Sequence, residues 1–164
     1  MAIGAIEVTR LPIDQKISLL AKLIKQGASD DRIRSTAFRI LQGVPEFNDM
    51  AEANALFTYV RDTIRYTRDP IGKDIFESPI YTLEKRSGDC DSTTVLLGSM
   101  MMAVGLPYRL KLVSKDGTNW SHIYGLVGIP KNNPRKWIPV DASSPKPMGW
   151  ENPKFKYARI YRII

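Results

Sequence analysis

The chain has 164 residues, of which 43% are hydrophobic, and it carries a formal net charge of +7, one cysteine and one histidine. This length and composition suit a globular domain with a substantial core, and a single cysteine excludes an internal disulfide framework. The N-terminus lacks the pattern of a signal peptide, and no apolar run approaches the ~20 residues that span a bilayer. We therefore expect a cytoplasmic protein of a reducing compartment, without a membrane segment.

The positive charge is unevenly distributed. Residues 44–104 carry six Lys/Arg and ten acidic residues, a net charge of −4, whereas residues 105–164 carry eleven and three, a net charge of +8. A basic C-terminal half is suited to an acidic partner such as nucleic acid or an anionic surface. Solvated strand faces are the preferred explanation of the same charge, and no RGG tract, zinc-ligand set or block of five Lys/Arg strengthens the nucleic-acid interpretation.

The chain begins with predicted helices. Apolar side chains recur at helical spacing within residues 12–26: Ile13, Ile17, Leu20 and Ile24. Gly27 suits the C-terminal cap of this helix, and Asp30 suits the N-cap of a second helix that ends before Gly43.

A third helix is predicted over residues 49–65. We divide the chain into an N-terminal helical segment, residues 1–45, and a main domain, residues 46–164, which together form one compact unit. The sequence does not decide whether the N-terminal helices cover a sheet, dimerise or gate a cleft.

The remainder of the chain changes from loop to helix to strand. Residues 66–88, rich in Pro and Gly, predict a long ordered loop, and a helix follows over residues 92–104, with the run Met100–Met102 as core filling. Strands are then predicted over residues 108–114, 122–129, 137–140 and 154–164. Helices followed by antiparallel strands indicate an α+β fold.

The only cysteine, Cys90, lies between two aspartates where the loop becomes a helix. The unpaired N–H groups and positive dipole of a helix N-terminus favour a thiolate, and they also stabilise an oxyanion. A nucleophilic thiolate needs a histidine base and a group that orients it. His122 opens one predicted strand and Asp141 ends the next, so the two residues lie side by side if these strands form a hairpin.

Spacing alone supports two interpretations equally. One is a Cys-His-Asp triad, and the other is an inert buried Cys90, a His122 held in a core hydrogen bond and an Asp141 that begins a turn. The scattered aspartates show no metal-ligand spacing, so we predict no metal and no cofactor.

Three segments add a resemblance to a known family. They are GDCDSTTVLLGSMMMAVGLPYRLKLV from Gly88, HIYGLV from His122 and WIPVDAS from Trp137. In this order they resemble the transglutaminase-like superfamily of cysteine proteases and acyltransferases, and LFTYVRDTIRYTRDP at residues 56–70 resembles the segment that precedes its core. The resemblance implies a papain-like α+β core, with the nucleophile helix packed on an antiparallel sheet and the N-terminal helices added to it.

The resemblance also implies roles for individual residues. Cys90 is the implied nucleophile, His122 the general base and acid, and Asp141 the orienting carboxylate. The implied reaction is acyl transfer on amide bonds of a protein or peptide substrate, and we expect hydrolysis in preference to transglutaminase-type cross-linking. Small basic members of the superfamily resemble proteins of bacteriophage structural modules, so a non-catalytic, virion-associated assembly role stays open.

Further candidates surround the implied nucleophile. Tyr81 and the indole of Trp120 are candidate partners for the backbone N–H of Cys90 in holding an oxyanion. Aromatic residues are the candidate lining of a substrate groove: Trp120, Tyr124, Trp137 and Trp150. The negative charges of Asp89 and Asp91 would repel a thiolate at Cys90. We therefore expect both side chains to point away from the sulfur, as caps of helix N–H groups or as contacts that stabilise the loop.

Overall fold

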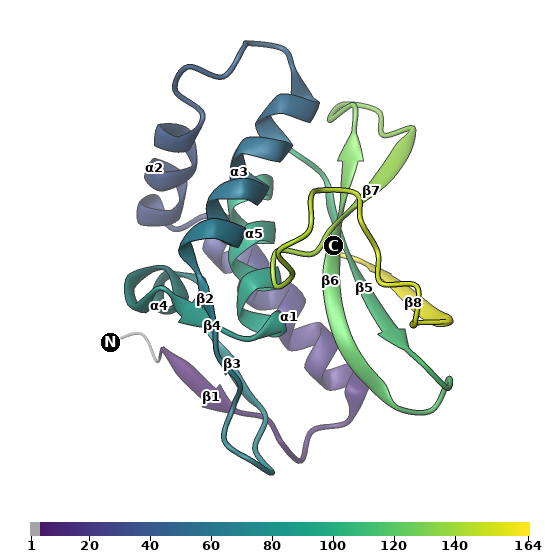
Figure 1. Ribbon diagram of the computed structural model, residues 1–164. Helices are drawn as coiled ribbons and strands as arrows, with labels where there is room; N and C mark the ends of the chain where they lie inside the picture. The colour runs from purple at the N-terminus through teal and green to yellow at the C-terminus, as the bar shows by residue number, and fades with distance from the viewer. Residues whose placement is uncertain (1–3) are drawn as a thin grey trace.

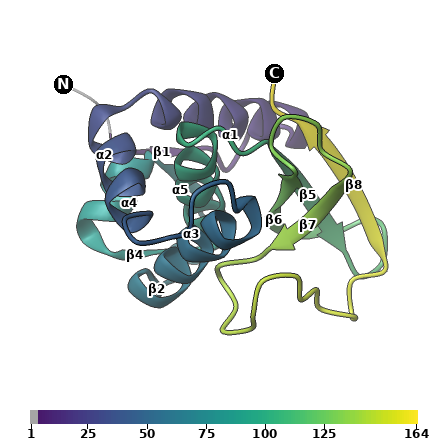
Figure 2. The ribbon, with the colours of Figure 1, turned by 90° about the horizontal axis from the view of Figure 1, so that it is seen from above.

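The computed structural model describes residues 4–164 and places helices against one side of a four-stranded sheet (Figures 1 and 2). The helices are α1 (Ile13–Ala28), α2 (Asp31–Ile40), α3 (Asp49–Thr63), α4 (Pro79–Lys85) and α5 (Cys90–Ala103). The strands are β1 (Ala5–Glu7), β2 (Arg65–Tyr66), β3 (Ile75–Glu77), β4 (Ser87–Gly88), β5 (Tyr108–Ser114), β6 (Trp120–Ile129), β7 (Lys136–Val140) and β8 (Tyr157–Arg162). The expected α+β fold is confirmed. Within residues 4–164, no helix is both long and apolar enough to cross a membrane.

The main sheet has the strand order β7-β6-β5-β8, and all its neighbouring strands are antiparallel. Two smaller sheets pair β1 with β3 and β2 with β4. The predicted strands are confirmed, although the last one begins at Tyr157 instead of residue 154. The predicted hairpin is also present, because β6 pairs with β7 in a register that sets Gly125 opposite Val140.

Helix α5 is the centre of the core. The other helices contact it, and β6 packs against its remaining side (Figure 2). Its apolar side chains are therefore buried on every face, with no exposed area at Leu96, Leu97, Met100 or Met101. A helix that is apolar all round is typical of such a central position. The interpretation of the methionine run as core filling is confirmed for Met100 and Met101, and Met102 packs against the same core while only partly buried.

The N-terminal helices contribute to this same core and do not stand apart from it. Helix α1 packs along α5 and buries Ile17, Leu20 and Ile24. The prediction that Gly27 caps α1 is wrong, because the helix continues to Ala28. A Cβ atom at Gly27 would lie 2.3 Å from the Ser99 hydroxyl oxygen, so this glycine allows α1 to approach α5 closely. The division at residue 45 stays a prediction from the sequence.

The predicted long loop over residues 66–88 is wrong. This segment contains α4 and three short strands, and only residues 67–74 form an extended connection. The local signal for α4 is Ser78 followed by Pro79: the Ser78 hydroxyl accepts the N–H of Tyr81 at 3.3 Å, and proline suits the first helical position. The proline that the sequence pattern assigns to a loop therefore begins a helix.

One aromatic side chain fixes the position of α5 on the sheet. The side chain of Tyr108 lies between Gly98 of α5 and Gly125 of β6, where added Cβ atoms would lie 2.5 Å from its ring and 2.0 Å from its hydroxyl oxygen. Its hydroxyl donates to the carbonyl of Thr94 at 3.0 Å, and the Thr94 hydroxyl donates to the carbonyl of Ile123 at 3.3 Å. These contacts hold the N-terminal half of α5 beside the part of β6 that carries the histidine.

Candidate active site

Cys90 is the first residue of α5, and a network of buried polar groups holds the start of that helix. The Asp89 carboxylate accepts the N–H of Ser92 at 3.1 Å, which is the N-cap contact expected from the sequence. The Ser92 hydroxyl lies within hydrogen-bond distance of Asp89 and of the buried Glu77, which is 2.6 Å away. Lys85 forms an ion pair with Glu77. The backbone that carries the thiol is therefore anchored on the side facing α4.

Asp91 does not point away from the sulfur as expected. Its Oδ1 atom lies 4.0 Å from the Sγ atom of the partly buried Cys90. The capping position is already filled by Asp89, so Asp91 is left facing the thiol. Burial raises the pKa of Cys90 well above its ordinary value, the carboxylates of Asp91 and Asp89 raise it further, and a backbone hydrogen bond from Ile123 opposes them. The thiol is consequently protonated at neutral pH in the free protein.

Three carboxylates cluster behind the thiol. Asp69, Asp89 and Asp91 place ligand atoms within 4.8 Å of one another, and among residues 4–164 they are the one group whose spacing would suit a cation. Burial is the main cause that raises the pKa of Asp89 to about 6, with the charge of Asp69 as a further cause. Burial and the charge of Asp89 also raise the pKa of Asp91. The sequence spacing gives no sign of this cluster, because the fold brings Asp69 beside the two aspartates at the start of α5.

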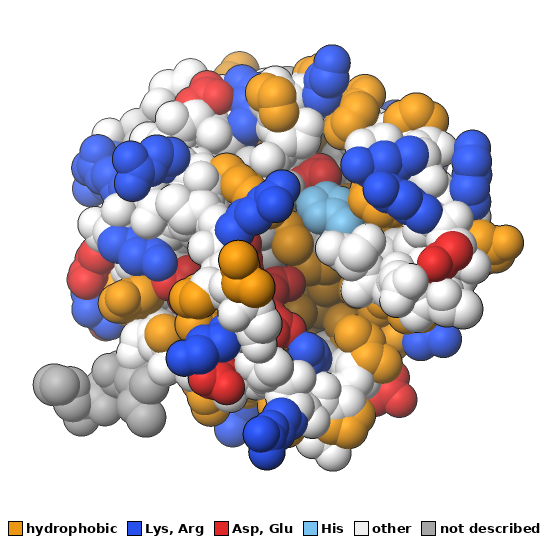
Figure 3. All heavy atoms as spheres, turned by 60° about the horizontal axis from the view of Figure 1, so that its bottom comes forward, with side chains coloured by type: hydrophobic (Ala, Val, Ile, Leu, Met, Phe, Trp, Pro, Cys, Tyr) orange, Lys and Arg blue, Asp and Glu red, His pale blue; other side chains and the backbone are white. Residues whose placement is uncertain are grey.

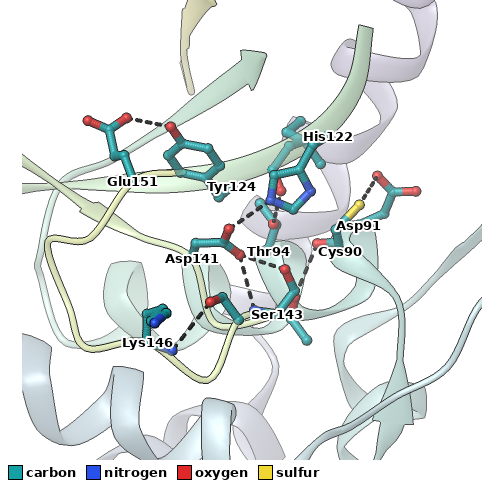
Figure 4. Close-up of polar contacts among 12 residues, drawn as sticks. Cys90, Asp91, Thr94, His122, Tyr124, Asp141, Ser143, Lys146 and Glu151 are labelled. Atoms are coloured by element: carbon teal, nitrogen blue, oxygen red, sulfur yellow. Dashed lines mark hydrogen bonds and ion pairs between the residues drawn. The ribbon is translucent and has the colours of Figure 1, made fainter. Parts of the chain in front are cut away.

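His122 on β6 and Asp141 immediately after β7 are in direct contact, as the hairpin register requires (Figure 4). The Nε2 atom of His122 lies 2.7 Å from Oδ2 of Asp141, and the other carboxylate oxygen accepts the hydroxyl of Ser143 at 2.6 Å. Burial acts to raise the pKa of Asp141, but the hydrogen bond and charge of His122, with Ser143, lower it below its ordinary value. An ionised Asp141 holds the proton on Nε2 and leaves the lone pair on Nδ1. The second ring nitrogen lies on the Cys90 side in Figure 4.

Cys90 and His122 line one cavity of about 250 Å³. Helix α1 supplies one wall, and its Lys16 forms an ion pair of 2.6 Å with Asp74, which also lines the cavity. Figure 3 shows the histidine at the edge of this hollow, with apolar and acidic side chains below it. The N-terminal segment therefore forms part of the candidate site.

The comparison with known families agrees with this arrangement. The profile of the transglutaminase-like superfamily matches residues 34–142. The chain belongs to the transglutaminase-like superfamily. No curated protein matches the sequence significantly.

Two solved structures share the fold of this transglutaminase-like protein. A candidate cysteine protease from Cytophaga hutchinsonii is 15% identical with a TM-score of 0.56, and the match covers 96% of this chain and 57% of that one. A candidate protease from Parabacteroides distasonis is 14% identical with a TM-score of 0.58, covering 78% of this chain and 26% of that one. The chain thus spans a little over half and about a quarter of the lengths of these two proteins.

Of the two candidate oxyanion donors, only Trp120 lies at the Cys90 cavity of this transglutaminase-like protein. Tyr81 is not among the described residues that line the cavity. It is 41% exposed on α4, with the Lys85 ammonium 5.0 Å from its ring centroid. The prediction of Tyr81 as an oxyanion donor is therefore not supported, because the residue lies on helix α4 with its ring exposed.

The candidate groove residues divide between two regions. Tyr124 lies against His122, with ring centroids 5.6 Å apart, and donates a hydrogen bond to Glu151. Trp150 lines a second cavity that also contains His122. Trp137 instead lies under the Arg109 guanidinium, 3.9 Å from its ring centroid, and lines neither of the two cavities at His122.

Two residues that hold the imidazole and its partner are not among the candidates predicted from the sequence. Ser143 donates its N–H and its hydroxyl to Asp141. The only local signal for this contact is Asp141 itself, since an Asp side chain commonly accepts the backbone N–H two residues later. Phe155 stacks on His122 with centroids 5.5 Å apart and an interplanar angle of 17°. No local pattern indicates that contact, because it depends on the path of the loop before β8.

Proposed function

We propose that this transglutaminase-like protein hydrolyses peptide or amide bonds by cysteine-dependent acyl transfer. Cys90 is the nucleophile, His122 the general base and acid, and Asp141 the orienting carboxylate. The observation that carries the proposal is the contact of 2.7 Å between Nε2 of His122 and Asp141, in an imidazole that shares a cavity with Cys90. Membership of the superfamily and the fold shared with two candidate proteases support it.

The first half of the reaction forms a thioester. The Cys90 thiol gives its proton to Nδ1 of His122, and Sγ attacks the carbonyl carbon of the substrate. The carbonyl electron pair moves to the oxygen, where the unpaired N–H groups of the first turn of α5, with the Trp120 indole as a candidate second donor, stabilise the oxyanion. When the oxyanion collapses, the C–N bond breaks and the imidazolium proton passes to the leaving nitrogen.

The second half releases the acid. Water gives a proton to His122 and adds to the thioester carbonyl, after which the C–S bond breaks and Sγ takes the proton back. The ionised Asp141 stabilises the imidazolium in both halves. The raised pKa of Cys90 fits this scheme, since the resting thiol is neutral and loses its proton to His122 as attack occurs.

The proposal is tested by incubating the full chain with a defined mixture of peptides and a fluorescent primary amine, followed by mass spectrometry. New peptide termini indicate hydrolysis. We expect them to disappear in Cys90→Ser and to form about 10²- to 10⁴-fold more slowly in His122→Ala, the usual contribution of general acid–base catalysis. Incorporation of the amine without new peptide termini would show that the protein catalyses transamidation and not hydrolysis.

A second readout addresses the alternative of an inert fold. The rate of Cys90 alkylation by iodoacetamide is measured against pH in the native chain and in His122→Ala. We expect the substitution to slow alkylation at neutral pH, because the base that removes the thiol proton is gone. Equal rates together with no Cys90-dependent change in any peptide would refute the catalytic proposal and favour a structural or assembly role.

A further inference from the structure

A second cavity, of about 390 Å³, adjoins the candidate active site and shares Ser121 and His122 with the Cys90 cavity. Its volume lies within the range of small-ligand sites. Its walls come from four separate parts of the chain: the connection after β2, the β5–β6 turn, the start of β6 and the loop between β7 and β8. The imidazole on which the proposed function depends is therefore part of the wall of this second cavity.

The side chains that line this second cavity are strongly basic. Arg68, Lys115 and Lys154 reach it from three different segments, and Asp141 is the one acidic residue among the described lining residues. The Asp141 oxygens already accept hydrogen bonds from His122 and Ser143. In residues 4–164, none of the three cations forms an ion pair with a carboxylate. The cavity therefore has an excess of positive charge with no internal partner.

Two aromatic side chains, Trp150 and Phe155, line the same cavity. Lys154 lies with its ammonium 5.4 Å from the centroid of Phe155, whose ring stacks on His122. The partly buried Trp150 also lines the cavity, and Asn152 beside it offers amide donors. The Phe155 ring thus holds the Lys154 ammonium at the cavity by a cation–π contact, while Arg68 and Lys115 reach it as exposed side chains.

The Cys90 cavity has the opposite character. Asp74, Asp89 and Asp91 line it, and Lys16 is the one cation among its described lining residues. Figure 3 shows acidic side chains within the hollow below the histidine and Lys or Arg side chains around it. A carboxylate on a bound substrate is thus repelled on one side of His122 and attracted on the other.

We propose that this second cavity binds an acidic side chain of the peptide substrate, which rests on the proposed function. Peptide is favoured over nucleic acid because the cations converge on one cavity at the imidazole. Binding along a phosphate backbone uses a stripe of such residues over a surface. The two cavities of opposite charge fix the orientation of the bound peptide. Its acidic residue lies in the cavity with Lys154 and is repelled from the cavity with Asp91.

The test is a binding measurement that needs no turnover. Two tetrapeptides that differ only by Asp or Asn are titrated into the isotopically labelled full chain carrying Cys90→Ser, and NMR shifts of the Trp150 indole and of Ser121 are followed. We expect the Asp peptide to bind about tenfold more tightly, as for a hydrogen bond to a charged group. The preference should weaken as ionic strength rises.

A double variant and a matched control locate the effect. In Arg68→Ala/Lys154→Ala we expect the ratio of the two affinities to fall towards one. In Arg135→Ala/Lys136→Ala, which removes the same charge from the distant β6–β7 turn, the ratio should persist. Equal affinities for both peptides, or an equal loss in the control, would overturn the proposal.

Two further outcomes separate the proposals from one another. Shifts at Trp150 and Ser121 with a thymidine oligonucleotide but not with the Asp peptide would overturn the inference in favour of nucleic acid. An Asp preference without Cys90-dependent turnover in the earlier peptide assay would support the anion site while refuting the hydrolase. Cys90-dependent turnover without an Asp preference would support the hydrolase and refute the anion site.

Discussion

Asp89 is a buried acid with two opposing effects on stability. Its side chain stabilises α5 by accepting the N–H of Ser92, but its negative charge is costly to bury. Its pKa is raised from 3.8 to about 6, mainly by burial. A folded-state pKa above the unfolded value means that folding favours the protonated form. The stability that the protonated Asp89 contributes is fully present below about pH 4 and is lost as pH rises through about 6. Two pKa units correspond to about 3 kcal/mol of unfolding free energy lost by pH 8.

The substitution Asp89→Asn removes the charge and keeps the cap. The amide oxygen of asparagine can still accept the N–H of Ser92, and asparagine is as good an N-cap as aspartate. We therefore expect Asp89→Asn to be about 3 kcal/mol more stable than the native chain near pH 8, and to differ little from it near pH 4.

Urea unfolding followed by circular dichroism at several pH values between about 4 and 8 measures this difference. Asp89→Ala serves as the control, because it removes both charge and cap and should be about 1 kcal/mol less stable than Asp89→Asn throughout. A stability difference between the native chain and Asp89→Asn that does not change with pH would refute the account of Asp89 as a buried, partly protonated acid.

Two other predictions concern the contact of α5 with the sheet and the environment of the thiol. Gly125→Ala places a Cβ atom 2.0 Å from the Tyr108 hydroxyl oxygen and should cost about 1–3 kcal/mol in urea unfolding. Tyr108→Leu in the same chain should recover part of that loss, and strictly additive effects would contradict the explanation. Asp91→Asn removes a carboxylate 4.0 Å from Sγ, which lowers the pKa of Cys90 and should speed its alkylation severalfold at neutral pH. Asp31→Asn, on the exposed start of α2, should leave the rate unchanged, and equal rates in both variants would exclude this role for Asp91.

Local sequence determined the main helices, the strands of the large sheet and the position of Cys90 at a helix start. Helical periodicity, strand composition and an Asp N-cap act over a few residues, so they can be recognised without the rest of the fold. The contact between His122 and Asp141 was predictable for the same reason, since a hairpin brings the ends of its two strands together. The segment around α4 was also predictable locally, from Ser78 and Pro79.

Only the tertiary structure decided what surrounds the imidazole. The orientation of Asp91 towards the sulfur depends on Asp89 already occupying the cap, and the stacking of Phe155 depends on the path of a long loop. The basic cavity joins Arg68 to Lys154, which are far apart in the chain and carry no shared pattern. Such contacts follow from how the other elements pack around α5, and that packing depends on the shapes of many buried side chains at once.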